Sequence, residues 1–339
     1  HDVVVETQSG TRIGYDDAAY EAVGARIAML PDDVYQSEMI IKVKEPQPSE
    51  YEFLTKGQIL FTYLHLAPDP QQTEALLSKQ VVGIAYETVT DDYGHLPLLV
   101  PMSEIAGRIS IHAGANALHM IHGGRGVLLG GVPGVLPANV VVIGGGIVGT
   151  EAARMAMGLG AHVTILDTNL KRLRQLDAQY GPHLKTRYST PHSLEECVLQ
   201  ADLVIGAVLI PGKSAPKLVS RDLVRRMLPG SVIVDVAIDQ GGCIETSRPT
   251  THSAPTYIVD DIVHYCVTNM PGACARTATE ALTHATMQPA MAIAKKGWQK
   301  ALFDDPHLRN GLNVCLGKVT NKGVAEDLGY DYVAPEECL

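Results

Sequence analysis

Several absences narrow the class of protein that this sequence encodes. No apolar run in its 339 residues is long enough to cross a bilayer, and the opening HDVVVETQSG lacks the features of a signal peptide. Internal repeats and low-complexity segments are absent as well. Lysine and arginine number 27 against 37 aspartates and glutamates, which gives a net charge of −10. This acidic balance argues against a nucleic acid or an anionic membrane as a partner.

Cysteine is sparse and follows no known pattern. The six cysteines form no CxxC pair and no His-plus-Cys zinc spacing, so they predict reduced thiols, a cytoplasmic location and no metal. The sequence also lacks two motifs, one for a serine nucleophile and one for a P-loop nucleotide site. There is no GxSxG elbow, and the glycine-rich stretch from Gly126 to Gly131 lacks the lysine and the serine or threonine of a P-loop. The sequence therefore argues against serine-hydrolase chemistry and against a P-loop nucleotide site.

The residues from Asn139 to Asp167, NVVVIGGGIVGTEAARMAMGLGAHVTILD, carry the clearest motif. Their first apolar run predicts a parallel strand that is buried on both faces. Gly144 then allows a tight turn, Gly146 lets a pyrophosphate approach the backbone, and Gly149 brings the next helix against the strand. Asp167 ends the following strand, where an acid binds ribose hydroxyls and repels a 2′-phosphate. This order predicts a dinucleotide site, with tight strand–helix packing as the alternative explanation of the glycines.

Strands and helices alternate on both sides of this motif, which predicts right-handed crossovers and an α/β fold. We expect two Rossmann-like domains with mostly parallel sheets, the nucleotide domain being inserted into the substrate domain. Residues 98–275 are predicted to form the NAD-binding domain, and residues 1–97 and 276–339 the substrate domain. The strands expected outside the motif lie over 2–5, 39–44, 58–63, 81–86, 203–208, 231–236 and 262–267. The expected helices lie over 16–27, 69–80, 98–120, near 170–177 and 193–199, and over 277–298 with a kink at Pro289. The tail is expected to hold a short strand and a helix.

Three ionisable residues follow expected strands, and open α/β sheets place their sites at such strand ends. Lys44 ends the run IIKVK, although an isolated lysine there is usually only solvated. His65 follows FTYL and is suited to proton transfer near neutral pH, although a histidine in an apolar segment is more often a hydrogen-bonded core residue. Asp239 follows SVIVDVAI and precedes a glycine turn, where a carboxylate indicates function. Asp235, inside the same strand, is better explained by a structural hydrogen-bonding role.

Long stretches of the sequence resemble one family. IIKVKEPQPSEY, GQILFTYLHLA, GGRGVLLGGVPGV, VVVIGGGIVGTEAA and PGSVIVDVAIDQGGCIETSRPTTHS are similar to segments of the alanine dehydrogenase family, in the superfamily that also holds the transhydrogenase α-subunits. The resemblance implies reversible oxidation of L-alanine with NAD and water to pyruvate, ammonium and NADH. It also implies a homohexamer, and two Rossmann-like domains around a cleft.

The resemblance also assigns roles to residues of this chain. It implies that Lys44 holds the substrate's carboxylate or keto oxygen and that His65 is the catalytic acid and base. It implies that Asp239 lies beside the nicotinamide and the substrate's amino group. The positions that match cofactor-binding residues of the family are Ser103, Gly144, Gly146, Gly149, Asp167, Arg172, Ser189, Val208, Leu209, Val236, Val267, Asn269 and Met270. Transhydrogenase α-subunits lack the aspartate in the segment that matches Val236 to Gln240, which favours a dehydrogenase here.

The sequence departs from the family pattern in two places. Family members have a strand, an arginine-bearing loop and a helix before the residue that matches His1, and that arginine binds the substrate's carboxylate. Without it we expect normal NADH binding but slow turnover, so a non-catalytic or transhydrogenase-like NAD(H)-binding subunit stays open as the alternative function. Ala278, Glu280 and His284 replace the family's usual Ser, Tyr and Asn, which bears on packing near the interdomain helix expected over 277–298 rather than on the chemistry.

Overall fold

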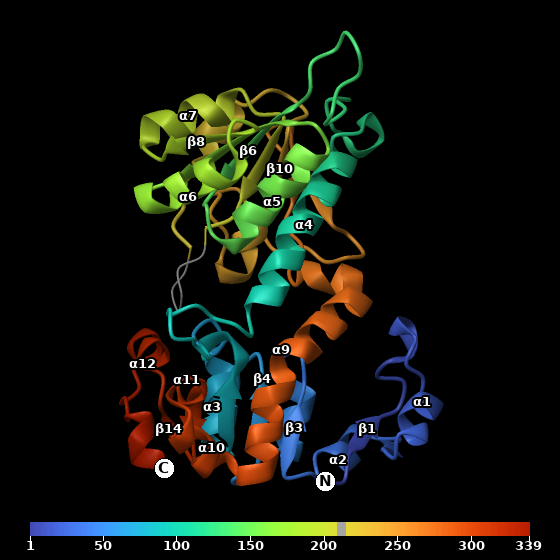
Figure 1. The fold of residues 1–339 in the computed structure, drawn as a ribbon, viewed down its shortest axis with the longest axis vertical. Coiled ribbons are helices and arrows are strands. Elements are labelled where there is room, and N and C mark those ends of the chain that lie inside the picture. The colour runs from blue at the N-terminus through green and yellow to red at the C-terminus, as the bar shows by residue number, and fades with distance from the viewer. Residues whose placement is uncertain (209–214) are drawn as a thin grey trace. The chain divides into compact units, whose positions relative to one another are not determined.

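The computed structural model describes residues 1–208 and 215–339 (Figure 1). The chain divides into two compact units. One combines both ends of the chain, His1–Pro101 and Ala275–Leu339, and is called the terminal unit below. The other, the central unit, is the continuous segment Met102–Cys274. Both contain mostly parallel strands with helices between them, which confirms the predicted α/β class.

The central unit is built on a seven-stranded sheet in the order β11-β12-β10-β9-β6-β7-β8. Every neighbouring pair is parallel except β11 and β12. The strands are β6 Asn139–Ile143, β7 His162–Asp167, β8 Leu184–Tyr188, β9 Leu203–Gly206, β10 Val232–Asp235, β11 Thr256–Val259 and β12 Ile262–Tyr265. The chain passes from β6 to β7 on one side and later places β9 on the other side. Open parallel sheets bind ligands at the carboxyl ends of their strands where the order reverses in this way.

Helices flank this sheet, and two of them, α4 Val100–Ala117 and α5 Ile147–Gly158, pack unusually closely. An added Cβ at Gly107 would lie 2.3 Å from the carbonyl oxygen of Val148, so glycine is needed where these helices meet. The nearby Glu151 carboxylate is nearly buried and accepts hydrogen bonds from Arg108 at 2.7 Å and Arg154 at 2.6 Å. These ion pairs fix the helix that follows the glycine turn. The helices are α4 Val100–Ala117, α5 Ile147–Gly158, α6 Leu170–Tyr180, α7 Pro191–Leu199 and α8 Arg221–Arg225.

The terminal unit contains a five-stranded sheet in the order β14-β13-β5-β4-β3. Strands β3 Met39–Ile41, β4 Ile59–Thr62 and β5 Val82–Ala85 are parallel, as their alternation with helices predicts. Beside β5 lies β13 Leu312–Cys315, which runs antiparallel to it and is followed by β14 Lys318–Val319. The tail thus supplies two strands where the sequence predicted one. The buried aliphatic residues that join the two ends of the chain include Leu60, Leu64, Leu76 and Val314.

The first strand of the chain does not join this sheet. Strand β1 Val4–Glu6 pairs in parallel with β2 Arg26–Ala28 and forms a separate two-stranded sheet. The sequence predicted a strand over residues 2–5 but no partner for it, because the run RIA is short and only partly apolar. The strand at Arg26–Ala28 also shows that the helix predicted over residues 16–27 is too long.

That helix, α1 Asp17–Ala22, begins where predicted and ends early. The Asp16 carboxylate caps its first turn by accepting a hydrogen bond from the Ala19 amide at 2.9 Å. Its end is set by Gly24, whose φ of +93° is the left-handed conformation that terminates helices. The predicted end therefore overlooked a glycine that stops the helix two residues after Ala22.

The other predicted helices of the terminal unit are present with shifted ends. The helix expected over 277–298 is α9 Ala275–Lys296, with Pro289 inside it, and Gly297 separates it from α10 Trp298–Asp304. On α9, Glu280 accepts a hydrogen bond from Arg276 at 3.2 Å. The remaining helices are α2 Pro31–Val34, α3 Pro70–Ser78, α11 Pro306–Arg309 and α12 Lys322–Leu328. Among residues 1–208 and 215–339, no helix is long and apolar enough to span a membrane.

Candidate active site

The glycine turn between β6 and α5 has the geometry of a nucleotide-binding loop. Gly144, with a φ of +105°, turns the chain out of β6, and a Cβ there would lie 2.6 Å from the carbonyl oxygen of Ala207. At Gly149 an added Cβ would lie 1.8 Å from the Gly144 oxygen, so α5 packs directly on the turn. At Gly146, by contrast, an added Cβ would meet none of the described atoms within 4 Å. The loop is therefore open at Gly146, where the first N–H groups of α5 are placed to bind an anion.

Asp167 and Arg172 tie this loop to the end of β7. One Asp167 oxygen accepts a hydrogen bond from the Gly145 amide at 2.6 Å, and the other accepts from Asn169 at 2.7 Å. The Arg172 guanidinium donates to the Gly145 oxygen at 2.6 Å and to the Thr150 hydroxyl at 2.7 Å. A carboxylate has about four acceptor positions, so Asp167 still has capacity for ribose hydroxyls. The N–H groups of Arg172, in contrast, already donate hydrogen bonds to the loop itself.

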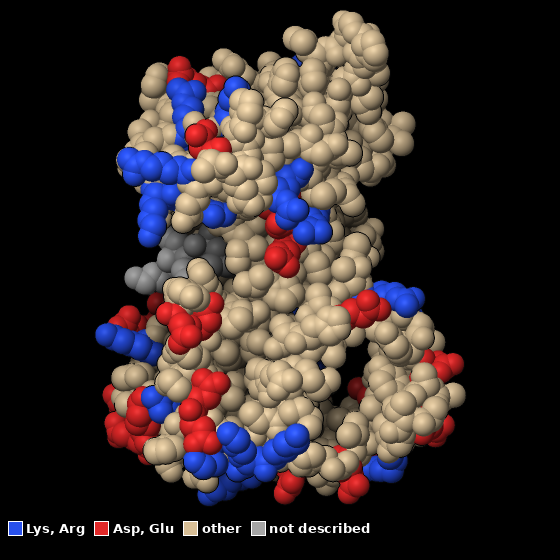
Figure 2. Space-filling model, in the orientation of Figure 1, with Lys and Arg blue, Asp and Glu red and all other residues tan. Residues whose placement is uncertain are grey.

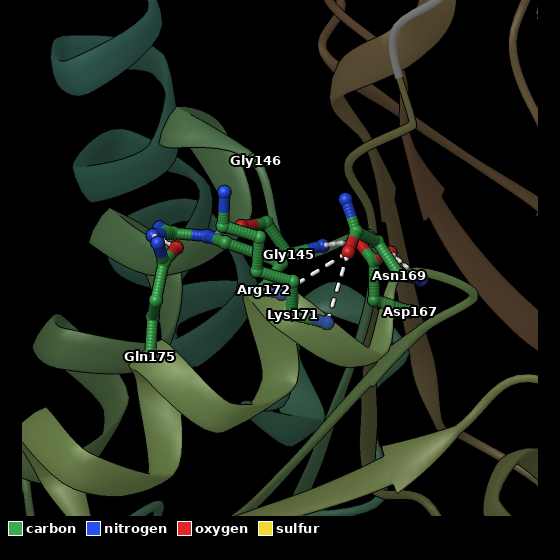
Figure 3. A pocket seen from close by; sticks show the side chains of 7 residues that line it. All are labelled: Gly145, Gly146, Asp167, Asn169, Lys171, Arg172 and Gln175. Carbon is green, nitrogen blue, oxygen red and sulfur yellow. Dashed lines mark hydrogen bonds between the residues drawn. The ribbon is translucent and has the colours of Figure 1, made fainter.

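A cavity of about 370 Å³ opens beside the loop (Figure 3). This volume lies within the range of roughly 300–1,000 Å³ typical of ligand pockets. Its lining is polar and carries both signs of charge, which suits a ribose and phosphates rather than an apolar ring. Asn169 caps α6 at its rim by accepting hydrogen bonds from the amides of Lys171 and Arg172. The lining residues are Gly145, Gly146, Asp167, Asn169, Lys171, Arg172 and Gln175.

Most of the other positions that match cofactor-binding residues lie at the same edge of the sheet. Ser189 follows β8, Val208 lies shortly after β9, and Val236 follows β10. Because these strands are parallel, their carboxyl ends meet along one edge with Gly144 and Asp167. Three further positions, Val267, Asn269 and Met270, follow β12, and Ser103 lies on α4. Leu209 lies outside the described residues.

Asp239 is also near this edge, but not directly after a strand. Strand β10 ends at Asp235, and Asp239 lies in the short 3-10 helix Val236–Gln240. Its carboxylate is exposed and accepts a hydrogen bond from the Asn269 amide at 3.3 Å. Asp235 is fully buried and accepts from the Ile244 amide at 3.1 Å, consistent with the structural role expected of it. The sequence placed Asp239 between a strand and a glycine turn, and the structure shows that a 3-10 helix joins the two.

In the terminal unit, Lys44 follows β3 but stands three residues beyond its end at Ile41. Its ammonium is half-exposed and lies 3.1 Å from Glu45 Oε1. The other oxygen of Glu45 is buried and has no hydrogen-bond partner among the described residues. The carbonyl oxygen of Lys44 accepts a hydrogen bond from the Thr62 hydroxyl at 3.2 Å, which ties Lys44 to the end of β4. A positive charge is thereby held at the carboxyl edge of this sheet.

His65 lies at the same edge, after β4, in a left-handed conformation with a φ of +49°. Its side chain is 45 % exposed, so it is not the buried core histidine that was the alternative explanation. The imidazole stacks on the ring of Tyr63, with centroids 5.8 Å apart and planes inclined by 7°. Burial raises the pKa of Tyr63 above its ordinary value, and its hydroxyl donates to the Leu98 oxygen at 2.7 Å. The Glu87 carboxylate lies 4.0 Å from His65 Nδ1.

The structure thus brings Lys44 and His65 to one edge of the terminal sheet, while Asp239 belongs to the central unit. The sequence did not single out Glu87 or Tyr63. Glu87 directly follows the apolar run VVGIAY, so the rule that selected Lys44 and His65 from strand ends would also have selected it.

A parallel sheet with a glycine turn and an acid at its reversal point, and a second sheet with a lysine and a histidine at its strand ends, define a dinucleotide-dependent α/β enzyme. Comparison with protein families gives a narrower result. The family model described as "Alanine dehydrogenase/PNT, N-terminal domain" matches residues 1–106, and "Alanine dehydrogenase/PNT, C-terminal domain" matches residues 110–322. The chain belongs to the alanine dehydrogenase/PNT family. The resemblance found in the sequence is confirmed.

Individual relatives agree with this assignment. The alanine dehydrogenase of Halomonas elongata is 57 % identical over 98 % of this chain and 90 % of its own length. That of Bacillus subtilis is 54 % identical over 100 % of this chain and 90 % of its own length. A solved L-alanine dehydrogenase superposes with a TM-score of 0.92 at 50 % identity, covering 97 % of this chain and 91 % of the solved one. A transhydrogenase from Sinorhizobium meliloti superposes at 0.78 over 94 % of this chain and 91 % of its own, but at 23 % identity it shows the fold alone.

Proposed function

We propose that this chain is an NAD-dependent L-alanine dehydrogenase. The reaction converts L-alanine, NAD and water to pyruvate, ammonium, NADH and a proton, and it also runs in reverse. The observation that carries this proposal is the likeness to alanine dehydrogenases at 50–57 % identity over 97 % or more of the chain. The aligned region extends through both units, so it includes the strand ends at which the candidate residues lie.

The residues around the glycine turn fit NAD. Gly146 leaves room for a pyrophosphate beside the N-terminus of α5, and Asp167 is placed to bind the ribose diol. Asp167 would repel a 2′-phosphate, and Arg172 is engaged by Gly145 and Thr150. The cavity lining has two basic residues, and among the described residues the Lys171 side chain makes no such bond to the loop. When bound, the nicotinamide accepts the hydride of the substrate's Cα. The other proposed cofactor contacts are Ser103, Ser189, Val208, Leu209, Val236, Val267, Asn269 and Met270.

Three side chains are proposed to act on the substrate. Lys44 attracts its carboxylate or keto oxygen as a point charge. His65 removes a proton as the carbonyl forms and returns it in the reverse reaction. Asp239 accepts hydrogen bonds from the amino group or from water and so orients that group toward the reacting carbon. By the family resemblance, all three side chains act on the same substrate molecule.

A non-catalytic or transhydrogenase-like NAD(H)-binding subunit is the alternative function. Both alternatives use the same nucleotide loop, so that loop does not separate them. Asp239 favours the dehydrogenase, because transhydrogenase α-subunits lack this aspartate by the resemblance given above. His65 favours it too, because an exposed imidazole at a strand end is suited to proton transfer.

Assembly and location are further parts of the proposal. The family resemblance supports a homohexamer, and the absence of a cysteine pattern supports the cytoplasm. Acidic and basic side chains are interspersed on the face drawn in Figure 2. With a net charge of −10, this supports a protein without a nucleic-acid or membrane partner. Light scattering coupled to gel filtration would test the hexamer, and a monomeric mass would contradict it.

Steady-state kinetics in both directions test the function. NADH formation is measured with L-alanine and NAD, and NADH consumption with pyruvate, with and without ammonium. We expect turnover in both directions, with no consumption of NADH when ammonium is omitted. Isothermal titration with NADH on the same preparation serves as the control for a folded nucleotide site. Tight NADH binding without turnover in either direction would favour the alternative.

A further inference from the structure

The short helix that carries Asp239 needs support from outside itself. Asp239 lies in the 3-10 helix Val236–Gln240, which follows β10 directly and ends at Gly241. A 3-10 helix of five residues has few hydrogen bonds of its own, and their geometry is poorer than in an α-helix. Strand β10 holds the first end of this helix. The groups that hold its second end therefore bear on how firmly the Asp239 carboxylate is placed.

That second end is a turn made of two glycines. Gly241 and Gly242 have φ values of +87° and +78°, a left-handed conformation that residues with a Cβ rarely adopt. An added Cβ at Gly242 would lie 2.7 Å from Asp235 Oδ2, so the turn packs against the buried end of β10. Among the described residues, no backbone amide donates to the carbonyl oxygens of these two glycines. The turn therefore presents oxygens that need another donor.

Lys217 is that donor. Its ammonium donates hydrogen bonds to the carbonyl oxygen of Gly241, to that of Gly242 at 2.9 Å and to that of Ile244 at 3.3 Å. An ammonium has three N–H groups, so these bonds use all of them on one turn. The charge is also favourably placed, because a cation near the carboxyl end of a helix interacts with its exposed carbonyl dipoles.

The backbone around Lys217 is fixed to the same turn. The Ala215 amide donates to the carbonyl oxygen of Gln240 at 2.9 Å, and the Leu218 amide donates to that of Cys243 at 2.8 Å. A lysine at the surface ordinarily leaves its ammonium in water. Lys217 is exposed, yet its ammonium turns back onto three carbonyl oxygens. Such convergence on one ammonium indicates a role in holding the turn.

We propose that Lys217 is a positioning residue for Asp239. By holding the glycine turn, it fixes the end of the 3-10 helix and so the place of the carboxylate that accepts from the Asn269 amide. The inference rests on the proposed function, in which Asp239 orients the amino group or water toward the reacting carbon. Loss of Lys217 should therefore impair the use of ammonium, while binding of NADH and pyruvate is retained.

The test compares Lys217→Met in two backgrounds, wild type and Asp239→Asn. Methionine keeps most of the apolar stem but has no donor. In the wild-type background we expect kcat/KM for ammonium to fall about tenfold, because a misplacement of about 1 Å can cost on the order of 10²-fold and only one end of the helix is released. KM for pyruvate and the dissociation constant of NADH should stay within about twofold. In the Asp239→Asn background the same substitution should have no further effect.

Two further variants complete the comparison. Lys79→Met is the matched control, because the Lys79 ammonium also donates to a backbone carbonyl oxygen, that of Glu52 at 3.1 Å, but in the terminal unit. It should leave kcat/KM for ammonium unchanged. If Lys217→Met does not fold, as judged by its melting curve, Lys217→Gln replaces it in both backgrounds. Glutamine has an amide donor but no charge, and a loss of about threefold is expected.

Three outcomes would overturn the inference. The first is a wild-type kcat/KM for ammonium in Lys217→Met. The second is an equal loss in both backgrounds, which would make Lys217 a general stabiliser of the unit. The third is a rise of KM for pyruvate as large as the loss with ammonium. A wild-type chain that turns over neither alanine nor pyruvate would instead overturn the proposed function, so the wild-type assay separates the two failures.

Discussion

The two units hold their candidate residues in opposite ways. In the central unit, Gly144, Gly146, Gly149 and Asp167 belong to one strand–turn–helix–strand segment, and the bonds of Asp167 lock that segment together. In the terminal unit, each candidate follows a different strand, and only the pairing of β3, β4 and β5 brings them to one edge. A site that is local in sequence can be recognised without the fold, whereas a site assembled by a sheet cannot. The units should also fail differently: loss of a central glycine should impair cofactor binding, and loss of a terminal side chain should impair turnover.

The largest effect is expected for His65→Ala. If the terminal unit supplies chemistry and the central unit binding, kcat should fall by about 10²–10⁴-fold while NADH affinity is unchanged. Stopped-flow turnover and an NADH titration on the same variant measure both quantities. His95→Ala is a suitable control, since His95 is an exposed histidine of the same unit that pairs with Asp91. Weakened NADH binding in His65→Ala would break the division between the units.

Asp239→Asn is expected to be an exception to the rule that substitutions in the central unit impair cofactor binding rather than turnover. Asp239 belongs to the central unit, yet we expect the substitution to lower kcat by roughly 10- to 1,000-fold, because a neutral amide cannot direct the amino group or water as a carboxylate does. NADH binding should survive, because asparagine can still accept from the Asn269 amide. Asp222→Asn, at an exposed position of the same unit, is the control. Turnover at the wild-type rate would remove Asp239 from the proposed chemistry.

Gly146→Ala tests the open side of the nucleotide loop. The unliganded fold should tolerate it, because no described atom lies within 4 Å of the added Cβ. In the complex, that Cβ would occupy space proposed for the pyrophosphate, so NADH affinity should fall about 10-fold or more, or at least ~1.4 kcal/mol. Calorimetric titration and a melting curve distinguish these effects. An unchanged affinity would mean that the phosphates lie elsewhere.

Gly149→Ala is the matched contrast on the same loop. Its Cβ would lie 1.8 Å from the Gly144 oxygen, so this substitution should destabilise the unliganded protein itself. Overpacking of this kind typically costs about 1–3 kcal/mol. The melting temperature should therefore fall in Gly149→Ala and stay constant in Gly146→Ala. Equal melting temperatures would show that α5 can move away from the turn.

The smallest effect is expected for Asp167→Asn, which sharpens the choice between cofactors. Wild-type protein should prefer NAD to NADP. Removal of the negative charge should lower the ratio of kcat/KM with NAD to kcat/KM with NADP by about tenfold. The preference should not invert, because Arg172 remains bound to Gly145 and Thr150. Comparable kcat/KM values with both cofactors in the wild type would contradict the role of Asp167.

The sequence predicted the inner strands of the central unit, but not its edge strands β8 and β11, for a physical reason. Strands buried on both faces are unbroken apolar runs, and β6, β9 and β10 are of this kind. The glycine turn is equally explicit, because only glycine fits at Gly144 and Gly149. Nothing local marks β13 as a neighbour of β5, because that pairing joins segments from opposite ends of the chain.

The candidate residues of the terminal unit show the same limit. The search for ionisable residues at the ends of expected strands found Lys44 and His65. The alternating pattern of β3 does not show, however, that this strand stops at Ile41. The Lys42 ammonium binds Glu50 at 2.5 Å and so ties the residue after β3 to the following 3-10 helix. Glu87 follows an expected strand as well, but the sequence does not show that its carboxylate accepts hydrogen bonds from the Leu64 and His65 amides after β4.

The position of β13 has a consequence for the order in which the protein folds during synthesis. Strand β5 leaves the ribosome early, but its neighbour β13 emerges only after the whole central unit has been made. The central unit is continuous and can bury its core while β3, β4 and β5 still lack their partner strand. The nascent chain would then hold a finished nucleotide fold beside a sheet with an open edge, which is a template for aggregation. Pulsed hydrogen exchange during refolding of the full chain tests this order, with amides of β6 and β9 expected to gain protection before those of β5.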